Sequence, residues 1–213
     1  MSKRMGIPFV AAAPSGTGKT TVCRGALERD DNLRFSVSHT TRRPRPGEVD
    51  GRDYHFVSSE TFRRMVDQGE FVEHAEYAGH LYGTSFASLR EPLDQGHDLM
   101  IEIEVQGARQ LRDRLSDARF VFLLPPSRAE LERRLRTRGT DRDDAIEHRL
   151  ALVDRELAAV EFFDYAIVND DLEAAIEALL SIVSAERAGE TAEVHQRFGR
   201  EEVLKRNPGL IAN

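Results

Sequence analysis

The chain has a single cysteine, Cys23, among its 213 residues. A lone thiol can form neither an internal disulfide nor a cluster of thiolate metal ligands. The seven histidines lack the short spacing of metal ligands, so we assign none of them a metal-binding or catalytic role. Long hydrophobic runs are also missing, which predicts a soluble globular protein without a membrane span. The sequence shows no internal repeat and no low-complexity segment.

The chain has fewer basic than acidic residues, with 30 Lys and Arg and 37 Asp and Glu, which gives a net charge of −7. A protein that binds nucleic acid needs a basic face, so we expect no nucleic-acid partner. The arginines gather in two short segments, 42–45 and 133–138, which favours a small, highly charged anion as the ligand. Taken individually, Arg43, Arg133 and Arg136 are better interpreted as solvated surface charges.

The first residues, MSKRMGIPFVAAAP, resemble a signal peptide because two basic residues precede an apolar stretch. The apolar part is short and contains Pro8, and cleavage after it would remove a strand that the next motif requires. We therefore expect the chain to be cytoplasmic.

The segment APSGTGKT is typical of a phosphate-binding loop, because it follows a short apolar run and precedes a helix-like segment. Gly16 and Gly18 let the backbone curl so that successive N–H groups point at a polyphosphate, and the helix adds its positive dipole end. Lys19 is expected to reach the β- and γ-phosphates, and the Thr20 hydroxyl to bind Mg²⁺. A glycine-rich turn with an incidental lysine is the alternative. The candidate nucleotide-binding residues here are Ala13, Pro14, Ser15, Gly16, Thr17, Gly18, Lys19, Thr20 and Thr21.

Apolar runs recur along the chain with helix-period segments between several of them, at 9–12, 35–37, 99–105, 119–124 and 165–168. This alternation predicts an α/β fold, a parallel sheet covered by helices on both faces. Residues 38–87 break the alternation and predict an α+β insert, and residues 128–158 predict a charged helical insert. Inserts beside a phosphate loop are candidates for moving lids. The expected core is 1–37, 88–127 and 159–213.

Local patterns predict several element boundaries. Ser127 and Glu130 form a capping-box pattern for a helix that Gly139 can end. A short helix is expected over 59–69, strands over 53–57 and 71–77, and a core-facing helix from an apolar stripe between 172 and 183. The tail 187–213 is charged and carries no motif, so an extra helix, an oligomer contact and a frayed end all remain open.

A second motif, SVSHTTRRPRPGEVDGRDYHF, spans 36–56. Arg42 and Arg45 lie three residues apart on a loop stiffened by two prolines, so both guanidinium groups can converge on one phosphate. Tyr54 can donate a third hydrogen bond to the same group, and hydroxyl groups between 38 and 41 offer further partners.

The two motifs together, APSGTGKT and SxTTRxxRxGExxGxxYxF, resemble guanylate kinase, and bacterial members most closely. The likeness continues in order through FVEHAEYAGHLYGT, IEIEVQGA, LPPS, RLRTRGTD, IEHRL and IVNDD, to about Glu186. It implies a P-loop nucleoside-monophosphate kinase fold with a GMP-binding insert (38–87) and a helical lid (128–158). The implied reaction is Mg²⁺-dependent transfer of the γ-phosphoryl group of ATP to GMP, and by extension to dGMP.

The resemblance also implies roles for single residues. The acceptor site comprises Ser38, Arg42, Arg45, Tyr54, Glu73, Tyr82, Gly83, Thr84, Glu102 and Glu104, with Arg42, Arg45, Tyr54 and Tyr82 on the GMP phosphate. Carboxylates suit the N1–H and N2–H₂ donors of guanine and would repel N1 of adenine. Lys19, Arg42, Arg134, Arg138 and Arg149 are the implied catalytic cations that neutralise the transferring group. Asn169 matches an adenine-contacting position, although an ordinary turn explains it almost as well.

The sequence departs from the family at Glu104, where Asp is usual, and at Ala13, the first position of the phosphate loop. Within a strand over 99–105, alternation would put Glu102 and Glu104 on one face, with Ile101, Ile103 and Val105 in the opposite layer. Glu102 would then lie near the Mg²⁺-bound phosphates and Glu104 near the acceptor base. A pair of solvated surface acids is the alternative.

Two other functions compete with the kinase. A guanylate-kinase-like module would bind phosphopeptides without chemistry, but such modules typically lose cations that this chain keeps in Lys19, Arg138 and Arg149. A kinase for a phosphorylated ribose is disfavoured by Glu73 and Thr84, which fit recognition of a base. The expected partners are therefore GMP and ATP, without nucleic acid or membrane, and a homo-oligomer is possible.

Overall fold

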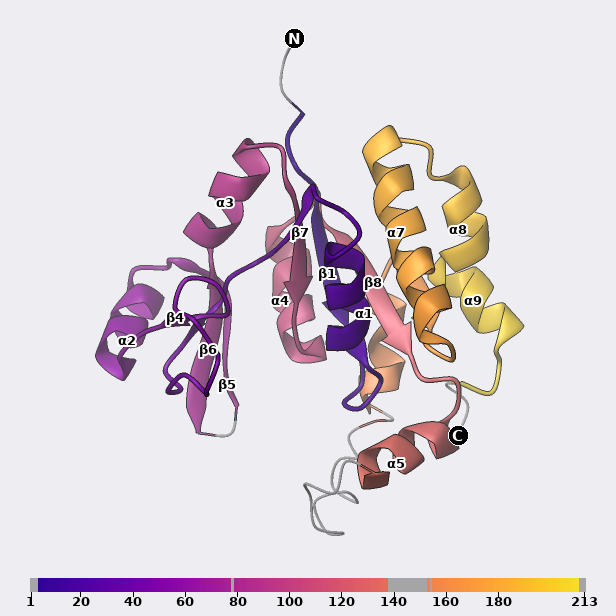
Figure 1. Cartoon of the computed structure of the whole chain (residues 1–213), viewed down its shortest axis with the longest axis horizontal. Helices are drawn as coiled ribbons and strands as arrows, with labels where there is room; N and C mark the ends of the chain where they lie inside the picture. The colour runs from indigo at the N-terminus through magenta and orange to yellow at the C-terminus, as the bar shows by residue number, and fades with distance from the viewer. Residues whose placement is uncertain (1–3, 78, 138–152, 154, 211–213) are drawn as a thin grey trace.

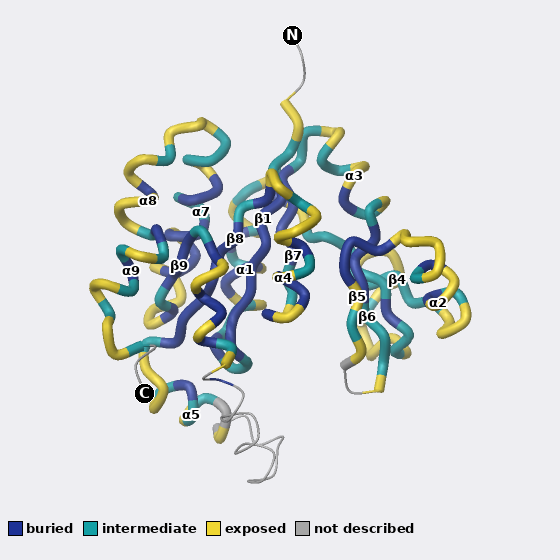
Figure 2. Tube along the Cα trace, turned by 180° about the vertical axis from the view of Figure 1, so that it is seen from behind, coloured by how far each residue is buried: buried dark blue, intermediate teal, exposed yellow. Residues whose placement is uncertain are grey.

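Five parallel strands form the central sheet of the computed structural model, which describes residues 4–77, 79–137, 153 and 155–210. Their spatial order is β2 (Leu33–Phe35), β7 (Asp98–Glu102), β1 (Pro8–Ala12), β8 (Arg119–Leu124) and β9 (Tyr165–Val168). Every residue of β1 is buried, as expected for a parallel strand covered on both faces. Figure 2 shows this central sheet as the most deeply buried part of the molecule.

The alternation of side chains along β1 divides the core into two layers. Phe9 and Ala11 pack with residues of α1 (Lys19–Leu27) and α7 (Leu172–Ala188), whereas Val10 and Ala12 pack with residues of α4 (Val105–Arg114). Helix α3 (Phe86–Asp94) contributes Leu89 to the α4 layer. Helices thus cover both faces of the sheet (Figure 1), and the predicted α/β class is confirmed.

One predicted strand is shorter than its apolar pattern. Strand β7 ends at Glu102, and Glu104 is already the residue that precedes the first turn of α4. The expectation that Glu102 and Glu104 share a strand face is therefore wrong. Ile101, Ile103 and Val105 do contribute to the same hydrophobic layer, which is why the apolar run continues past the end of the strand.

A second sheet of four strands lies beside the first (Figure 1). Its order is β4 (His55–Phe56), β3 (His39–Thr40), β6 (His80–Ser85) and β5 (Phe71–Tyr77), with β5 and β6 antiparallel. Helix α2 (Ser59–Asp67) closes it through a small core of Phe62, Met65 and Phe71. The predicted helix over 59–69 ends two residues early, because Gly69 adopts a left-handed backbone with φ of 66°.

Helix α5 (Arg128–Thr137) begins the predicted helical insert. The Glu130 N–H donates to Ser127 Oγ at 3.0 Å, as the capping pattern predicts. Arg133 and Arg136 are largely exposed and pair with Glu130 and Glu132 on the same helix. Gly139, Arg138 and Arg149 lie outside the described residues.

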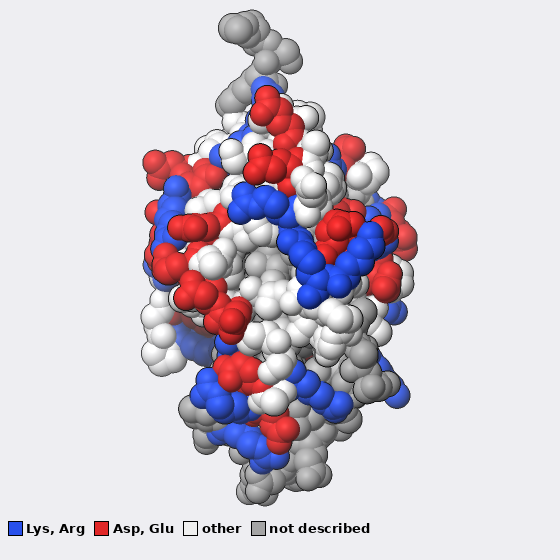
Figure 3. Space-filling view, turned by 90° about the vertical axis from the view of Figure 1, so that its right-hand side faces the viewer, with Lys and Arg blue, Asp and Glu red and all other residues white. Residues whose placement is uncertain are grey.

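The tail after α7 forms two short helices. Additional helical structure, one of the three possibilities that the sequence leaves open for this tail, is therefore confirmed. Helices α8 (Ala192–Phe198) and α9 (Arg200–Arg206) pack on β9, and Gly199 between them forms an antiparallel bridge with Tyr165. A short 3-10 helix, η1 (Ala159–Phe162), leads into β9. On the face that carries these helices, basic and acidic side chains are intermixed (Figure 3).

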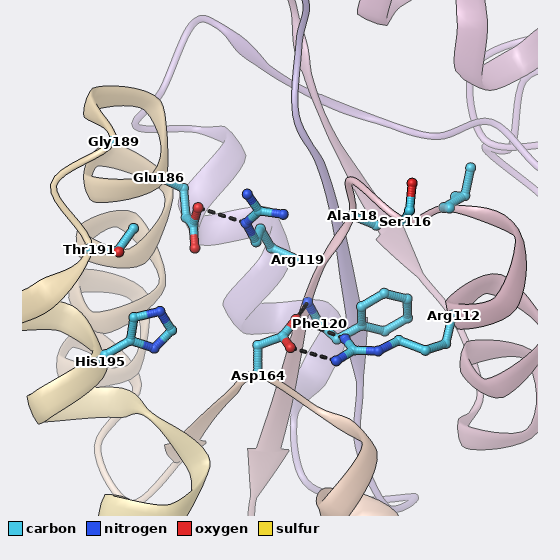
Figure 4. Close-up of a pocket in the computed structure, with 11 residues that line it drawn as sticks. Arg112, Ser116, Ala118, Arg119, Phe120, Asp164, Glu186, Gly189, Thr191 and His195 are labelled. Carbon is cyan, nitrogen blue, oxygen red and sulfur yellow. Dashed lines mark hydrogen bonds and ion pairs between the residues drawn. The ribbon is translucent and has the colours of Figure 1, made fainter.

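A polar cavity of about 660 Å³ lies where β8 and β9 begin, bordered by the ends of α4 and α7 and by α8 (Figure 4). Its charged groups are already paired with one another: Arg112 binds Asp164 at 2.6 and 2.9 Å, and Arg119 binds Glu186 at 2.7 Å. The predicted phosphate loop follows the carboxyl end of β1. Because the strands are parallel, this loop and the cavity lie at opposite ends of the strands. This cavity is therefore remote from the predicted phosphate loop.

None of the described helices is both long and apolar enough to cross a membrane.

Candidate active site

The predicted phosphate loop connects β1 to α1. Gly16 and Gly18 adopt left-handed backbones with φ of 89° and 94°, which only glycine adopts without strain. Helix α1 begins at Lys19, so its first N–H groups and its positive dipole end face the loop. Ala13, the first residue of the loop, is buried directly after the end of β1. The loop has the backbone geometry that a polyphosphate site requires.

Lys19, Thr20 and Glu102 come together beside this loop. Lys19 Nζ donates to the carbonyl of Ile103 at 2.6 Å and lies 3.8 Å from Glu102 Oε1, while the Thr20 hydroxyl donates to the Glu102 carboxylate. A hydroxyl and a carboxylate are the oxygen ligands that suit Mg²⁺, which usually keeps waters and phosphate oxygens as its other ligands. Among the described residues, no group of three or more His, Cys, Asp or Glu side chains could hold a metal. The donor set therefore fits a nucleotide-bound Mg²⁺ rather than a cage of protein ligands.

Asn169 and Arg134 contact the middle of the phosphate loop. Asn169 is buried, and its Nδ2 donates to the Thr17 carbonyl at 2.7 Å. Arg134 Nη1 donates to the carbonyls of Asn169 and Thr17 at 3.2 and 3.4 Å, and its Nε binds Glu130 at 2.8 Å. The amide of Asn169 is thus bound to the loop backbone.

Glu156, which the sequence reasoning missed, also reaches the loop. The Ser15 N–H donates to its Oε2 at 3.4 Å. Burial raises the pKa of Glu156, the Ser15 hydrogen bond lowers it, and the nearby charge of Glu104 raises it further. No local motif identifies this residue, because its partner is 141 positions away in the sequence.

Arg42, two residues after the end of β3, lies among aromatic rings. The Arg42 Cζ lies 5.5 Å from the centre of the Tyr54 ring and 5.8 Å from that of Phe56, and the Tyr54 and Tyr82 rings meet edge to face at 6.1 Å. The pKa of Arg42 is raised mainly by its hydrogen bonds to Glu48, and a hydrogen bond to Tyr82 raises it further. The structure thus brings together three of the four residues implied in phosphate binding.

Glu48, also missed from the sequence, binds both ends of the arginine loop. Arg42 donates to its two carboxylate oxygens at 2.8 and 2.9 Å, and the Arg45 N–H donates to it at 2.7 Å. These hydrogen bonds hold the pKa of Glu48 below its usual range. The Arg45 side chain is exposed, so the structure does not show the two guanidinium groups converging.

The predicted base-recognition residues form a buried hydrogen-bonded set. Glu73 and Thr84 are register partners on β5 and β6, and the Thr84 hydroxyl donates to Glu73 Oε1 at 2.7 Å. Ser38 Oγ lies 3.1 Å from Thr84 Oγ1. Burial raises the pKa of Glu73, against the hydrogen bonds from Thr84, which lower it. This sheet therefore presents a buried carboxylate with hydroxyl groups beside it.

Two further site candidates differ in their surroundings, since one is closely packed and the other is exposed. A Cβ on Gly83 would approach Phe71 and Phe62 to 2.9 and 3.0 Å, so glycine is needed there for the small core of the second sheet. Glu104 is exposed at the start of α4. A Cβ on Gly107, also on α4, would lie 3.3 Å from Glu73 Oε2, which places Glu73 against the helix that follows Glu102 and Glu104. The predicted base-recognition residue Glu73 is thus adjacent to the core that carries the predicted phosphate loop.

Comparisons with known proteins identify the family of the chain. The family model described as guanylate kinase matches residues 5–186. The chain is 49% identical to the guanylate kinase of Geobacter metallireducens over 185 residues, covering 87% of this chain and 91% of the relative. It is 54% identical to that of Nitratidesulfovibrio vulgaris over 177 residues, covering 83% and 86%.

A solved structure supports the same relationship. The crystal structure of guanylate kinase from Anaplasma phagocytophilum aligns with a TM-score of 0.69 at 33% identity, covering 98% of both chains. The predicted P-loop nucleoside-monophosphate kinase fold is confirmed by this match and by the parallel sheet with its helices. The chain belongs to the guanylate kinase family.

Proposed function

We propose that this chain transfers the γ-phosphoryl group of ATP to GMP, and likewise to dGMP, giving ADP and the nucleoside diphosphate. The observation that carries this proposal is Glu73, a buried carboxylate that accepts a hydrogen bond from Thr84 and lies against α4. An ionised carboxylate accepts from the N1–H and N2–H₂ groups of guanine, whereas adenine presents an acceptor at N1. For Ser38 or Thr84 to donate to guanine O6, the bound base would have to displace the hydrogen bonds that these hydroxyl groups make to Thr84 and Glu73.

The donor phosphates would occupy the phosphate loop, 13–21. Lys19 would leave the Ile103 carbonyl to follow the charge that moves between the β- and γ-phosphates. When bound, Mg²⁺ would supply a positive charge shared by these phosphates, held by Thr20 with Glu102 alongside. No general base is needed, because the acceptor is already a phosphate oxygen.

The GMP phosphate would bind Arg42, Arg45, Tyr54 and Tyr82, with Gly83 and Glu104 bordering the acceptor site. Arg134, Arg138 and Arg149 would add positive charge around the transferring group, and positioned cations supply most of the rate in such reactions. We propose the division into core (1–37, 88–127, 159–213), GMP-binding insert (38–87) and lid (128–158). We also propose a cytoplasmic enzyme without a nucleic-acid partner.

The test is a coupled assay with ATP and Mg²⁺ that compares GMP, dGMP, AMP and UMP as acceptors. We expect turnover of GMP and dGMP and little of AMP or UMP. Equal use of AMP, or no turnover of GMP, would contradict the proposal. The family match and the site give no support to the non-catalytic phosphopeptide-binding alternative.

A further inference from the structure

Thr17 lies in the middle of the phosphate loop, and its carbonyl points into the protein. It accepts a hydrogen bond from Asn169 Nδ2 at 2.7 Å and a longer one from Arg134 Nη1 at 3.4 Å. Thr17 is fully buried and Asn169 is 6% exposed, so water does not compete for this carbonyl. The shorter of the two bonds comes from a residue 152 positions further along the chain.

The direction of this carbonyl fixes the direction of the next N–H group. A peptide bond is planar and trans, so the C=O of Thr17 and the N–H of Gly18 point in opposite directions. With the oxygen held toward Asn169, the Gly18 N–H is turned to the other side of the loop, where successive N–H groups would meet the donor phosphates. A Cβ on Gly18 would lie 2.8 Å from Asn169 Nδ2, so the amide packs directly against this peptide.

We propose that Asn169 is a positioning residue for the phosphate loop. Its amide keeps the Thr17 carbonyl away from the polyphosphate and the Gly18 N–H toward it. Asn169 therefore affects how tightly the loop binds the donor's phosphates, and this effect does not depend on the base that the donor carries. This inference deepens the proposed function and rests on it for the identity of the loop's ligand. It differs from the adenine contact that the resemblance implies for the same residue.

The decisive variant is Asn169→Asp, which has nearly the same shape but places a carboxylate oxygen against the Thr17 carbonyl. Two acceptors repel, so the peptide between Thr17 and Gly18 loses its preferred orientation. Asn169→Ala removes the amide without adding charge. Asp170→Asn is the matched control, because Asp170 is the next residue and is exposed.

The readouts are steady-state kinetics with ATP and with UTP as donor, and calorimetric binding of ATP, UTP, GMP and inorganic tripolyphosphate, which has no base. For Asn169→Asp we expect kcat/KM to fall about 10- to 100-fold with either donor, because the buried Thr17 carbonyl loses its shorter hydrogen bond, keeps only the long one from Arg134 and faces a repelling carboxylate. Tripolyphosphate binding should weaken by a similar factor, and Asn169→Ala should show a smaller loss of the same kind. GMP binding, and every parameter of Asp170→Asn, should match the wild type.

Other results would overturn the inference. If ATP binding weakens while UTP and tripolyphosphate are unaffected, Asn169 contacts the base. If no donor is affected, the loop does not depend on this amide. Retained GMP binding shows that a variant is folded, and if Asn169→Asp fails this check, the tripolyphosphate affinity of Asn169→Ala decides. A wild type that binds tripolyphosphate but does not phosphorylate GMP would contradict the proposed function and leave this inference standing.

Discussion

Glu48 binds Arg42 through both carboxylate oxygens, at 2.8 and 2.9 Å, with side chains only 19% and 11% exposed. The pair uses Nη1 and Nη2 of the guanidinium group, and Nη1 also donates to the Arg43 carbonyl at 2.7 Å. A phosphate that binds Arg42 must therefore approach it from the Nε side or displace Glu48. Arg42 is thereby held in one orientation before any ligand arrives.

We accordingly expect Arg42→Ala to raise the KM for GMP while leaving that for ATP nearly unchanged. Loss of a charge-assisted hydrogen bond costs about 1.5–3 kcal/mol, or roughly 10- to 150-fold in KM. Arg43→Ala is the control, since that side chain is exposed on the same loop. Steady-state titration of each substrate makes the comparison. An equal rise in the KM for ATP would show that the loop does not serve the acceptor alone.

Lys19→Met should abolish turnover with the fold intact, because its ammonium group is the cation placed at the start of α1 beside the phosphate loop. The measurement is kcat at saturating ATP and GMP, with circular dichroism as the check on folding. Lys205→Met, on the exposed side of α9, should keep wild-type rates. Retention of even a tenth of the wild-type kcat would remove this loop from the donor site.

Glu73→Gln should lower kcat/KM for GMP by about 10- to 1000-fold, because an amide donor would then face the donors of guanine. Discrimination against AMP should shrink in the same variant. Glu76→Gln, an exposed carboxylate on the same strand, serves as the control. A variant that keeps wild-type preference for GMP over AMP would place base recognition elsewhere.

The pKa of Glu73 predicts a pH dependence of the same site. Burial raises that pKa above its usual value of 4.5, and only the ionised form accepts both guanine donors. As pH falls, Glu73 is protonated earlier than an ordinary glutamate, so kcat/KM for GMP should fall on the acid side of the profile. Glu73→Gln should lose that part of the acid limb, and an unchanged limb in this variant would assign it to another group.

Asp98 should be a large contributor to stability. Its buried carboxylate accepts hydrogen bonds from Arg4, from Arg187 and from the Ile7 N–H. Burial alone would raise the pKa of Asp98, but these partners hold it below the usual value. Asp98 therefore stabilises the folded protein fully at pH values above the pKa that it has in the unfolded chain. This stabilisation is lost as the pH falls through the lower pKa that Asp98 has in the folded protein.

Removing this carboxylate in Asp98→Ala takes away a partner of Arg4, of Arg187 and of the Ile7 N–H. Both arginine side chains are partly exposed and Arg187 keeps Asp30, so the loss should be about 1–3 kcal/mol. Urea unfolding at neutral pH measures the loss. Asp94→Ala, an exposed position four residues earlier, should change stability little. The difference between Asp98→Ala and the wild type should narrow as the pH is lowered, and a constant difference would rule out ionic pairing as its source.

Cys23 should resist thiol reagents in the folded protein. It is fully buried on α1, and burial raises the pKa of its thiol to about 12, with a smaller contribution from Glu102. Because the thiolate is the reactive form, iodoacetamide at pH 8 should label the chain only after denaturation. Rapid labelling of the native protein would show that this layer of the core opens.

The parts of the molecule that could be predicted from the sequence are those encoded locally. The phosphate loop, the capping of α5 and the core strands each depend on residues close together in the chain, and the structure has them. The least accurate position is that of β2, which spans Leu33–Phe35 and shares only Phe35 with the expected run over 35–37. The expected strand over 99–105 runs past the observed end of β7 at Glu102, because Ile103 and Val105 continue the apolar pattern although the backbone has already turned into α4.

The contacts that were missed join distant residues. Glu156 to Ser15, Asn169 to Thr17 and Arg187 to Asp98 are 141, 152 and 89 positions apart. The sequence around a polar residue in a helix or a turn does not indicate which distant residue it binds. The family resemblance implies roles for the residues that bind substrate, but not the contacts that hold those residues in place. Glu48 lies only three residues after Arg45. A carboxylate within an arginine-rich loop is a local signal that could have predicted its ion pair with Arg42.

The bridge between Gly199 and Tyr165 bears on self-association. A strand at the margin of a sheet exposes unpaired backbone groups that another chain can join. At β9 the C-terminal helices pack against that margin, and Gly199 already pairs with its first residue. A second copy that extended the central sheet would find this side occupied and would have to add to β2, a strand of three residues at the other margin.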